Sequence, residues 1–216
     1  MIAVVDYCKG NLKSVERGLR FVGGDARITD DPAEIARAQA IVLPGVGAFA
    51  DAAHSMESAG QMPVLREAIT KGVPFLGICL GLHLLYEEGA EDAPEGGPNT
   101  RGLGVLPGVV DRMPSRDASG KLYKIPHVGW NTIDIVDGAT CPLLEGISSG
   151  EYFYFTHSYI APDSANTVAT TTHSVAFPCA AQFGDVAFGV QFHPEKSSDA
   201  GMAVLENFLR VVKAAG

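Results

Sequence analysis

The sequence predicts an α/β fold with a mostly parallel central sheet, helices on both faces and an antiparallel extension. Short apolar runs alternate with helical segments in the first half. The second half contains short β-like pieces separated by Pro and Gly. Of the 216 residues, 46% are hydrophobic, enough for a full core. We expect one domain over residues 1–216.

The first half contains repeated strand–helix units. Strands are expected over residues 2–5, 25–29, 40–43 and 74–78, and helices over residues 11–22, 32–38, 48–58, 64–71 and 80–88. Gly23 and Gly24 end the first helix. Units of this length favour a doubly wound parallel sheet, whose sites lie at the carboxyl ends of the strands.

The second half begins with residues 89–102, where Gly, Pro, Asn and acidic residues predict an exposed, mobile loop. β-like pieces follow over residues 103–110, 121–125, 132–136, 152–159, 167–171, 180–183 and 186–191. A last helix is expected over residues 199–213, with an apolar stripe facing the core.

The composition excludes several classes of protein. The 25 acidic and 16 basic residues give a net charge of −9, which argues against a nucleic-acid partner. No apolar run reaches the length of a membrane helix, and the apolar start predicts a first strand and no signal peptide. The four cysteines form no CxxC pair, which suits reduced thiols and a cytoplasmic protein. No spacing indicates a metal site, and no cofactor is expected.

Gly77-Ile78-Cys79-Leu80-Gly81 has the form of a nucleophile elbow, placed where an apolar strand turns into a helix. Glycines beside a nucleophile leave room for neighbouring chain and substrate. The positive end of the helix favours the Cys79 thiolate, and the amide of Leu80 points to where an oxyanion would form. Taken alone, the same pentapeptide also fits a buried structural cysteine.

His193-Pro194-Glu195 supplies a base and a carboxylate. We expect an extended segment from His193 to Glu195, in which residues two apart point to the same side. Glu195 would then orient the imidazole of His193 and leave its other nitrogen for Cys79. Alone, this tripeptide could be an ordinary turn with a solvated Glu.

Gly45-Val46-Gly47 follows the third predicted strand. The segment lacks the lysine of a phosphate loop and the third glycine of a dinucleotide site. A second amide donor to the oxyanion, beside that of Leu80, is its better interpretation.

Together these motifs resemble the class I (triad) glutamine amidotransferases. More narrowly, residues 5–12, Pro126–Asn131 and Tyr154–Tyr159 resemble the glutaminase subunits of imidazole glycerol phosphate synthases. The resemblance covers the whole chain. It implies that glutamine is hydrolysed to glutamate and ammonia. The ammonia would then pass to a (β/α)8-barrel cyclase subunit in a heterodimer that serves histidine biosynthesis.

The resemblance also implies roles for further residues. Ser158 and Tyr159 would hold the α-carboxylate of glutamine, and Glu91 would face its amino group. The residues expected at the cyclase interface are Asn11, Trp130, Tyr154 and Lys196.

The chain departs from the family at two positions. The family usually has Gln four residues after the nucleophile, where it helps to bind the substrate, and this chain has His83 there. The glycine that usually follows Asp-Tyr is Cys8, which is strained if that glycine serves a positive φ.

Three alternatives remain open at this point. The glutaminase could serve another synthase, of the anthranilate or guanylate type, although residues 126–131 argue against this. The chain could be a noncatalytic scaffold for the cyclase. It could also be a cysteine peptidase or thiol-stress protein on a similar fold.

Overall fold

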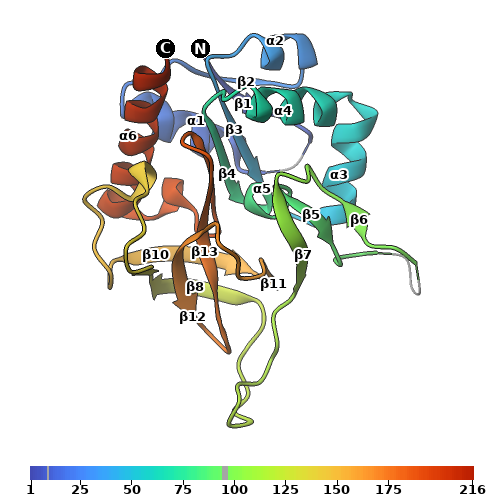
Figure 1. The fold of residues 1–216 in the computed structure, drawn as a ribbon, viewed down its shortest axis with the longest axis vertical. Coiled ribbons are helices and arrows are strands. Elements are labelled where there is room, and N and C mark those ends of the chain that lie inside the picture. Colours follow the sequence, from blue (N-terminus) through green and yellow to red (C-terminus); the bar gives the residue numbers. More distant parts are fainter. Residues whose placement is uncertain (9, 94–96) are drawn as a thin grey trace.

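The computed structural model describes residues 1–8, 10–93 and 97–216 (Figure 1). Its centre is an eight-stranded sheet in the order β2-β1-β3-β4-β14-β13-β12-β9. The parallel part contains β1 (Ile2–Val5), β2 (Ala26–Thr29), β3 (Ala40–Gly45), β4 (Phe75–Cys79) and β14 (Ala187–Val190). The antiparallel part contains β13 (Ala176–Phe183), β12 (Thr167–Thr172) and β9 (Asp134–Ile135). The predicted fold class is confirmed.

Helices cover both faces of this sheet (Figure 1). α1 (Leu12–Phe21) and α6 (Ser198–Ala215) pack on one face, and α2 (Pro32–Ala36), α3 (Phe49–Ser58) and α4 (Gln61–Thr70) pack on the other. β1 shows how the sequence divides between the two cores: Ile2 and Val4 join the α1–α6 side, whereas Ala3 and Val5 join the opposite side. None of the helices in the described ranges is both long and apolar enough to cross a lipid bilayer.

Two smaller sheets flank the carboxyl ends of the parallel strands. One pairs β8 (His127–Thr132) with β10 (Tyr152–His157). The other has the order β11-β7-β5-β6 and contains β5 (Tyr86–Gly89), β6 (Thr100–Arg101), β7 (Leu106–Arg112) and β11 (Tyr159–Ile160). Two short 3-10 helices, η1 (Pro142–Leu144) and η2 (Pro194–Lys196), lie in connections.

The helix predicted over residues 80–88 is wrong in its second half. α5 (Leu80–His83) is one turn long, and β5 follows it at once. Leu84, Leu85 and Tyr86 are all buried, and a fully apolar run does not show by its periodicity whether it is helix or strand. Tertiary packing decides, since β5 pairs with β7 in the side sheet.

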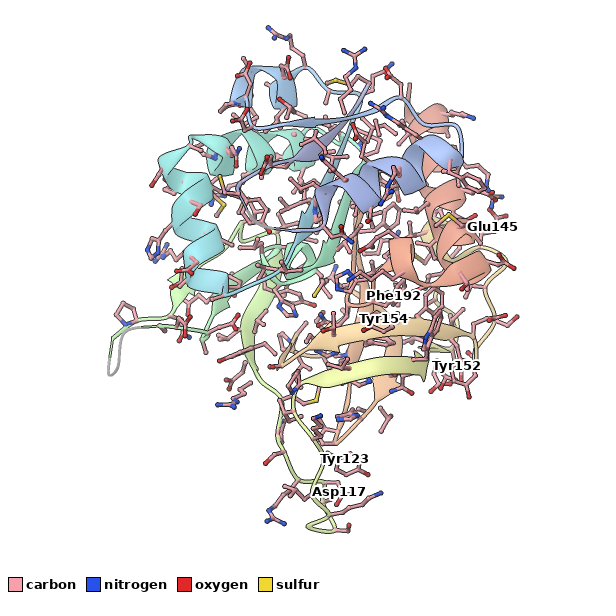
Figure 2. All side chains as sticks on the ribbon, turned by 180° about the vertical axis from the view of Figure 1, so that it is seen from behind. Asp117, Tyr123, Glu145, Tyr152, Tyr154 and Phe192 are labelled. Atoms are coloured by element: carbon pink, nitrogen blue, oxygen red, sulfur yellow. The ribbon has the colours of Figure 1, made fainter. Side chains whose placement is uncertain are left out.

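Three other expectations in the second half need correction. Residues 121–125 form no strand and contribute only a bridge between Arg116 and Leu122. They belong to a projecting loop between β7 and β8, with Asp117 and Tyr123 near its tip (Figure 2). The strand expected over residues 132–136 is divided between β8 and β9. The loop expected over residues 89–102 contains parts of β5 and β6, and its residues 94–96 lie outside the described residues.

Candidate active site

The candidate site lies at the carboxyl edge of the parallel strands. β3 ends at Gly45, β4 ends at Cys79, and β14 leads directly into Gln191. β3 and β14 both pair with β4, so the segments that follow them flank the cysteine. This placement agrees with the rule for doubly wound sheets.

Cys79 stands on a strained turn. Its φ of 55° and ψ of −105° lie outside the regions that residues with a side chain prefer, and α5 begins at the next residue. A Cβ on Gly77 would collide with the backbone of Gly81, and one on Gly81 would collide with the carbonyl oxygen of Leu43. Both glycines are therefore required by close backbone approach, and the amide of Leu80 begins the helix beside the sulfur.

His193 and Glu195 form a buried pair. Nδ1 of His193 lies 2.9 Å from Oε1 of Glu195, and their side chains are 3% and 1% exposed. Nε2 of His193 is buried and has no hydrogen-bond partner among the described residues. Burial alone would lower the pKa of His193, but the neighbouring Cys79 and Glu195 outweigh it and raise this pKa to about 9. The imidazolium is therefore favoured beside the sulfur.

The expectation that His193 to Glu195 is extended is wrong in its second half. His193 is extended, but Pro194–Lys196 form η2, and the amide of Lys196 donates to the carbonyl of His193 at 3.0 Å. The carboxylate reaches the imidazole through this turn. Proline fits at the first position of a short helix, where its missing N–H costs no hydrogen bond.

The Cys79 sulfur has two further polar neighbours. It lies 3.8 Å from the carbonyl oxygen of Thr156 and 3.7 Å from Nε2 of Gln191. Oε1 of Gln191 is in turn 2.7 Å from Nε2 of His83. Burial lowers the pKa of His83 to about 4, although its contact with Gln191 acts in the opposite direction. His83 is therefore uncharged at neutral pH.

A cavity of about 390 Å³ opens onto the sulfur. Its volume lies in the range of about 300–1,000 Å³ that small-molecule sites occupy. Eight predicted site residues line it: Val46, Gly47, Cys79, Leu80, His83, Glu91, Ser158 and Tyr159. Gly45, His193 and Glu195 are not among the lining residues, and Gly45 and the side chains of His193 and Glu195 are buried.

The Gly45–Gly47 segment passes from buried to exposed as it leaves β3. The Tyr7 hydroxyl fills the space that a Cβ on Gly45 would need. This hydroxyl is buried and without a partner in the described part of the chain. Burial raises the pKa of Tyr7, and the charges of Cys79 and Asp6 raise it further. Tyr7 thus contacts Gly45 and interacts electrostatically with Cys79.

Glu91 also lines the cavity and is half-buried. Its Oε2 accepts from the backbone amide of Phe49 at 3.0 Å, at the first residue of α3. Burial raises the pKa of this carboxyl, whereas the bond from Phe49 acts against the shift. The bond from Phe49 holds the Glu91 carboxylate at the cavity wall.

A chain of two histidines supports the wall formed by Ser158 and Tyr159. Asn131 Nδ2 is 3.3 Å from Nε2 of His127, whose Nδ1 is 3.1 Å from Nε2 of His157. Nδ1 of His157 is 2.9 Å from the carbonyl oxygen of Tyr159. One assignment satisfies every contact: both neutral imidazoles carry their proton on Nδ1. Burial lowers the pKa of His127 to about 4 and that of His157 well below its usual range.

Three of the residues expected at a partner face, Trp130, Tyr154 and Lys196, lie together. Trp130 on β8 is 51% exposed, and its ring meets that of Tyr154 edge-on, with 6.1 Å between centroids. Nζ of exposed Lys196 lies 5.8 Å from the centroid of the Tyr154 ring. Asn11 is partly exposed just before α1. Figure 2 shows Tyr154 on β10 next to Phe192, which precedes His193.

Cys8 has a φ of 65°, so this position does require the conformation that glycine adopts most easily. Its amide donates to Oδ1 of Asp6 at 2.7 Å. The side chain is exposed and is not part of the cavity lining.

Several site residues were missed by sequence reasoning. Gln191, Thr156, Tyr7 and the His127–His157 pair all contact or support the site. Gln191 had a usable signal, because it stands two residues before His193 on an extended segment. The other three contact the site only through the pairing of distant strands. Across the described ranges, no group of three or more His, Cys, Asp or Glu residues could hold a metal ion.

Comparisons with known proteins identify the family of the chain. Residues 3–212 match the family model "Glutamine amidotransferase class-I". The chain is 46% identical over 211 residues to the imidazole glycerol phosphate synthase subunit HisH of Syntrophotalea carbinolica, which covers 96% of this chain and 98% of the relative. It is 44% identical to the subunit of the same name from Moorella thermoacetica, over 100% of this chain and 97% of the relative.

Solved structures show the same fold at low sequence identity. One described as "Crystal structure of glutamine amidotransferase" has a TM-score of 0.73 at 19% identity and covers 99% of this chain and 100% of that chain. The structure of PurLQS from Thermotoga maritima has a TM-score of 0.67 at 20% identity, with 97% of each chain covered. By the family model and by full-length relatives, the chain belongs to the class-I glutamine amidotransferases, in the family of the HisH subunit of imidazole glycerol phosphate synthase.

Proposed function

We propose that Cys79, His193 and Glu195 hydrolyse glutamine to glutamate and ammonia, and that the ammonia passes to a cyclase subunit in histidine biosynthesis. The observation that carries this proposal is the buried pair of His193 and Glu195 beside a strained cysteine that lines a cavity of about 390 Å³. A nucleophile, its base and a carboxylate that orients the base are the parts of a catalytic triad.

The reaction follows from the position of each group. The Cys79 thiolate attacks the side-chain amide carbon of glutamine, and the oxyanion is held by the amide of Leu80 and an amide of the Gly45–Gly47 segment. His193 gives its proton to the departing ammonia. It then takes a proton from water, which hydrolyses the glutamyl thioester and releases glutamate and the free thiolate. Glu195 keeps Nδ1 of His193 protonated throughout.

The substrate backbone lies, in this proposal, at the outer part of the cavity. Ser158 and Tyr159 hold the α-carboxylate, and Glu91 faces the amino group, where its negative charge is complementary. The half-buried position of Glu91 and its bond from Phe49 support this role, because they fix the carboxylate at the cavity wall.

Trp130, Tyr154, Lys196 and Asn11 form the proposed cyclase face. The exposed Trp130 ring supports this assignment, because tryptophan is enriched at binding hot spots. Ammonia released into water at neutral pH is mostly protonated and no longer nucleophilic, which is a physical reason for a direct route between subunits. A cytoplasmic location is part of the proposal and is supported by four free cysteines, as expected in a reducing compartment.

The test uses the chain in complex with its cyclase subunit. Cys79→Ala should abolish synthesis that depends on glutamine and leave synthesis from added ammonia intact. Cys141→Ala, at a buried cysteine outside the cavity lining, is the matched control and should retain both activities. Glutamine-dependent synthesis by Cys79→Ala would show that the nucleophile is wrongly assigned. Wild-type complex that uses ammonia only would favour the noncatalytic scaffold.

A further inference from the structure

A buried chain of three side chains connects α5 to the nucleophile. Nε2 of His83 lies 2.7 Å from Oε1 of Gln191, and Nε2 of Gln191 lies 3.7 Å from Sγ of Cys79. His83 is 4% exposed, Gln191 is fully buried and Cys79 is 6% exposed. Buried polar groups are costly unless they are paired, so these contacts are strongly held.

The position of Gln191 explains how it reaches the sulfur. It precedes His193 by two residues, directly after β14, which runs beside β4. Gln191 and His193 therefore approach Cys79 from the same segment, one with an amide and the other with an imidazole. His83 approaches from α5, four residues after the nucleophile.

The orientation of the Gln191 amide decides what the sulfur receives. In the observed arrangement Oε1 faces His83, so the NH₂ group faces Cys79. An N–H donor stabilises a thiolate more than a thiol, because the charged sulfur is the better acceptor. With the amide reversed, a carbonyl oxygen would face the sulfur and would favour the protonated thiol instead.

His83 selects between these two orientations. Only a protonated Nε2 can donate to Oε1 of Gln191, and a neutral imidazole carries a proton on one nitrogen. The reversed amide would require His83 to accept at Nε2 and to move its proton to Nδ1. The tautomer of His83 therefore determines the orientation of the Gln191 amide. That orientation determines whether an N–H or a carbonyl oxygen faces the sulfur.

We propose that His83 is a positioning residue that orients the side-chain amide of Gln191, so that Gln191 donates an N–H to the sulfur of Cys79. The inference rests on the proposed function, in which Cys79 is the nucleophile. It assigns His83 an action through Gln191, in place of the direct contact with glutamine that the resemblance implies for this position. A Gln at position 83 would serve the same purpose, since a carboxamide also carries an N–H donor.

Other titratable groups around the sulfur stay constant in the test. His193 and Tyr7 interact electrostatically with Cys79, and Glu195 contacts Nδ1 of His193. His157 interacts electrostatically with His83. Variants at positions 83 and 191 leave all four of these side chains in place.

The experiment measures the rate at which iodoacetamide alkylates Cys79 between pH 5 and pH 10 in the complex with the cyclase subunit. The Cys79 peptide is quantified by mass spectrometry, because Cys8 is exposed and would be alkylated as well. Gln191→Met should slow alkylation at pH 7 about tenfold and move the midpoint of the profile upward by about one to two pH units. kcat for glutamine should fall, with little change in KM.

Variants at position 83 separate positioning from substrate binding. His83→Leu should shift the alkylation midpoint in the same direction as Gln191→Met, and the double variant should shift it no further. His83→Gln should restore the wild-type profile. Gln191→Glu retains the shape of the side chain and should shift the midpoint at least as far, since a carboxylate repels a thiolate. His54→Leu and Gln39→Met, both at exposed positions, are the matched controls.

Three results would overturn the inference. One is a Gln191→Met profile identical to wild type, and another is additive shifts in the double variant. The third is a rise in the KM of His83→Leu for glutamine with no shift in the pH profile of alkylation. That result would show that His83 contacts glutamine directly. These failures leave the proposed function intact. Wild-type complex whose Cys79 is not alkylated and which hydrolyses no glutamine would instead refute the proposed function itself.

Discussion

The backbone amide of His193 donates to the carbonyl oxygen of Tyr154 at 2.9 Å. The proposed base is therefore attached to β10, the strand that pairs with the Trp130 strand. Ser197 closes this arrangement, because its hydroxyl accepts from the amide of Tyr154 at 3.0 Å and donates to the carbonyl of His193 at 2.7 Å. A single buried hydroxyl thus fixes the distance between the partner face and the base.

Ser197→Ala should make the position of His193, the proposed base, less fixed, and should leave Cys79 in place. Ser197 is 1% exposed, so its removal leaves the Tyr154 amide unpaired, at a cost of about 1–3 kcal/mol in the free energy of unfolding. Glutaminase kcat in the complex should fall about tenfold or more, with a smaller change in KM. Urea denaturation and steady-state kinetics measure the two effects. Ser148→Ala, at an exposed serine, is the control, and equal kcat for both variants would contradict the prediction.

Gly45→Ala should disturb the oxyanion segment through Tyr7. The added Cβ would meet the Tyr7 hydroxyl at a distance that real Cβ atoms essentially never show. Overpacking of this kind costs about 1–3 kcal/mol, and it should displace the segment that we propose holds the oxyanion. Thermal unfolding should show the loss of stability, and kcat for glutamine should fall strongly.

A second substitution tests whether Tyr7 is the cause. Tyr7→Phe alone should be nearly neutral for stability, because the hydroxyl is buried without a partner among the described residues. The Gly45→Ala, Tyr7→Phe double variant should recover part of the lost stability, with the contact to Leu80 Cβ at 3.0 Å still tight. If the double variant is no more stable than Gly45→Ala, the collision does not involve the hydroxyl.

Local patterns in the sequence were sufficient to predict the parallel half of the fold. The strands over residues 2–5, 25–29 and 40–43 were predicted within one or two residues. The first and third are short apolar runs, and each of the three is followed by a helical segment. The elbow at Cys79 could also be predicted from local sequence, because its glycines are required where neighbouring backbone approaches closely.

The rest depends on contacts between distant segments. β5 was expected as helix, since the apolar run from Leu84 to Tyr86 is compatible with either structure, and only the pairing of β5 with β7, which begins at Tyr86, decides between them. The histidine chain from His127 to Tyr159 has no sequence signal of its own, because its members meet only when β8 and β10 pair. The roles of Glu91, Ser158 and Tyr159 at the cavity wall were expected only from the family resemblance. The periodicity of a sequence predicts helices and strands but gives no information about substrates or partners.

Trp130→Ala should weaken the complex with the cyclase subunit. The ring is half exposed and packs against Tyr154, so its removal takes away a large apolar contact at the proposed face. We expect the Kd to rise at least tenfold by isothermal titration calorimetry. Glutamine hydrolysis, which we expect to be slow in the isolated chain and strongly raised by the cyclase with its bound ribotide, should need a higher cyclase concentration.

Phe21→Ala is the control for this prediction. Phe21 is 82% exposed at the last residue of α1, whereas Asn11 precedes the first, so the two lie about 15 Å apart along the helix. An unchanged Kd for Trp130→Ala, or an equal loss for Phe21→Ala, would place the interface elsewhere. Equal turnover by the isolated and the complexed protein would remove the argument for activation by the partner.

Buried histidines should make the protein sensitive to acid. Burial holds the pKa of His83 and His127 at about 4 and that of His157 well below the usual value of 6.5. Between pH 6.5 and pH 4 the unfolded chain therefore binds protons that the folded chain excludes, and the free energy of unfolding falls as the pH falls. His193 has the opposite sign: its pKa is raised to about 9, so its contribution is lost as the pH rises from 6.5 through 9.

His127→Phe tests the acid side of this argument. The phenyl ring retains the stacking against Phe155, where the ring centroids are 4.9 Å apart, and removes one titrating group. The variant loses the contact with His157 and should be less stable at pH 7, but its free energy of unfolding should fall less steeply than that of the wild type between pH 6.5 and pH 4. Urea denaturation at half-unit pH steps measures the slope. His54→Phe, at an exposed histidine, should keep the wild-type slope, and an unchanged slope for His127→Phe would show that His127 already titrates normally in the folded protein.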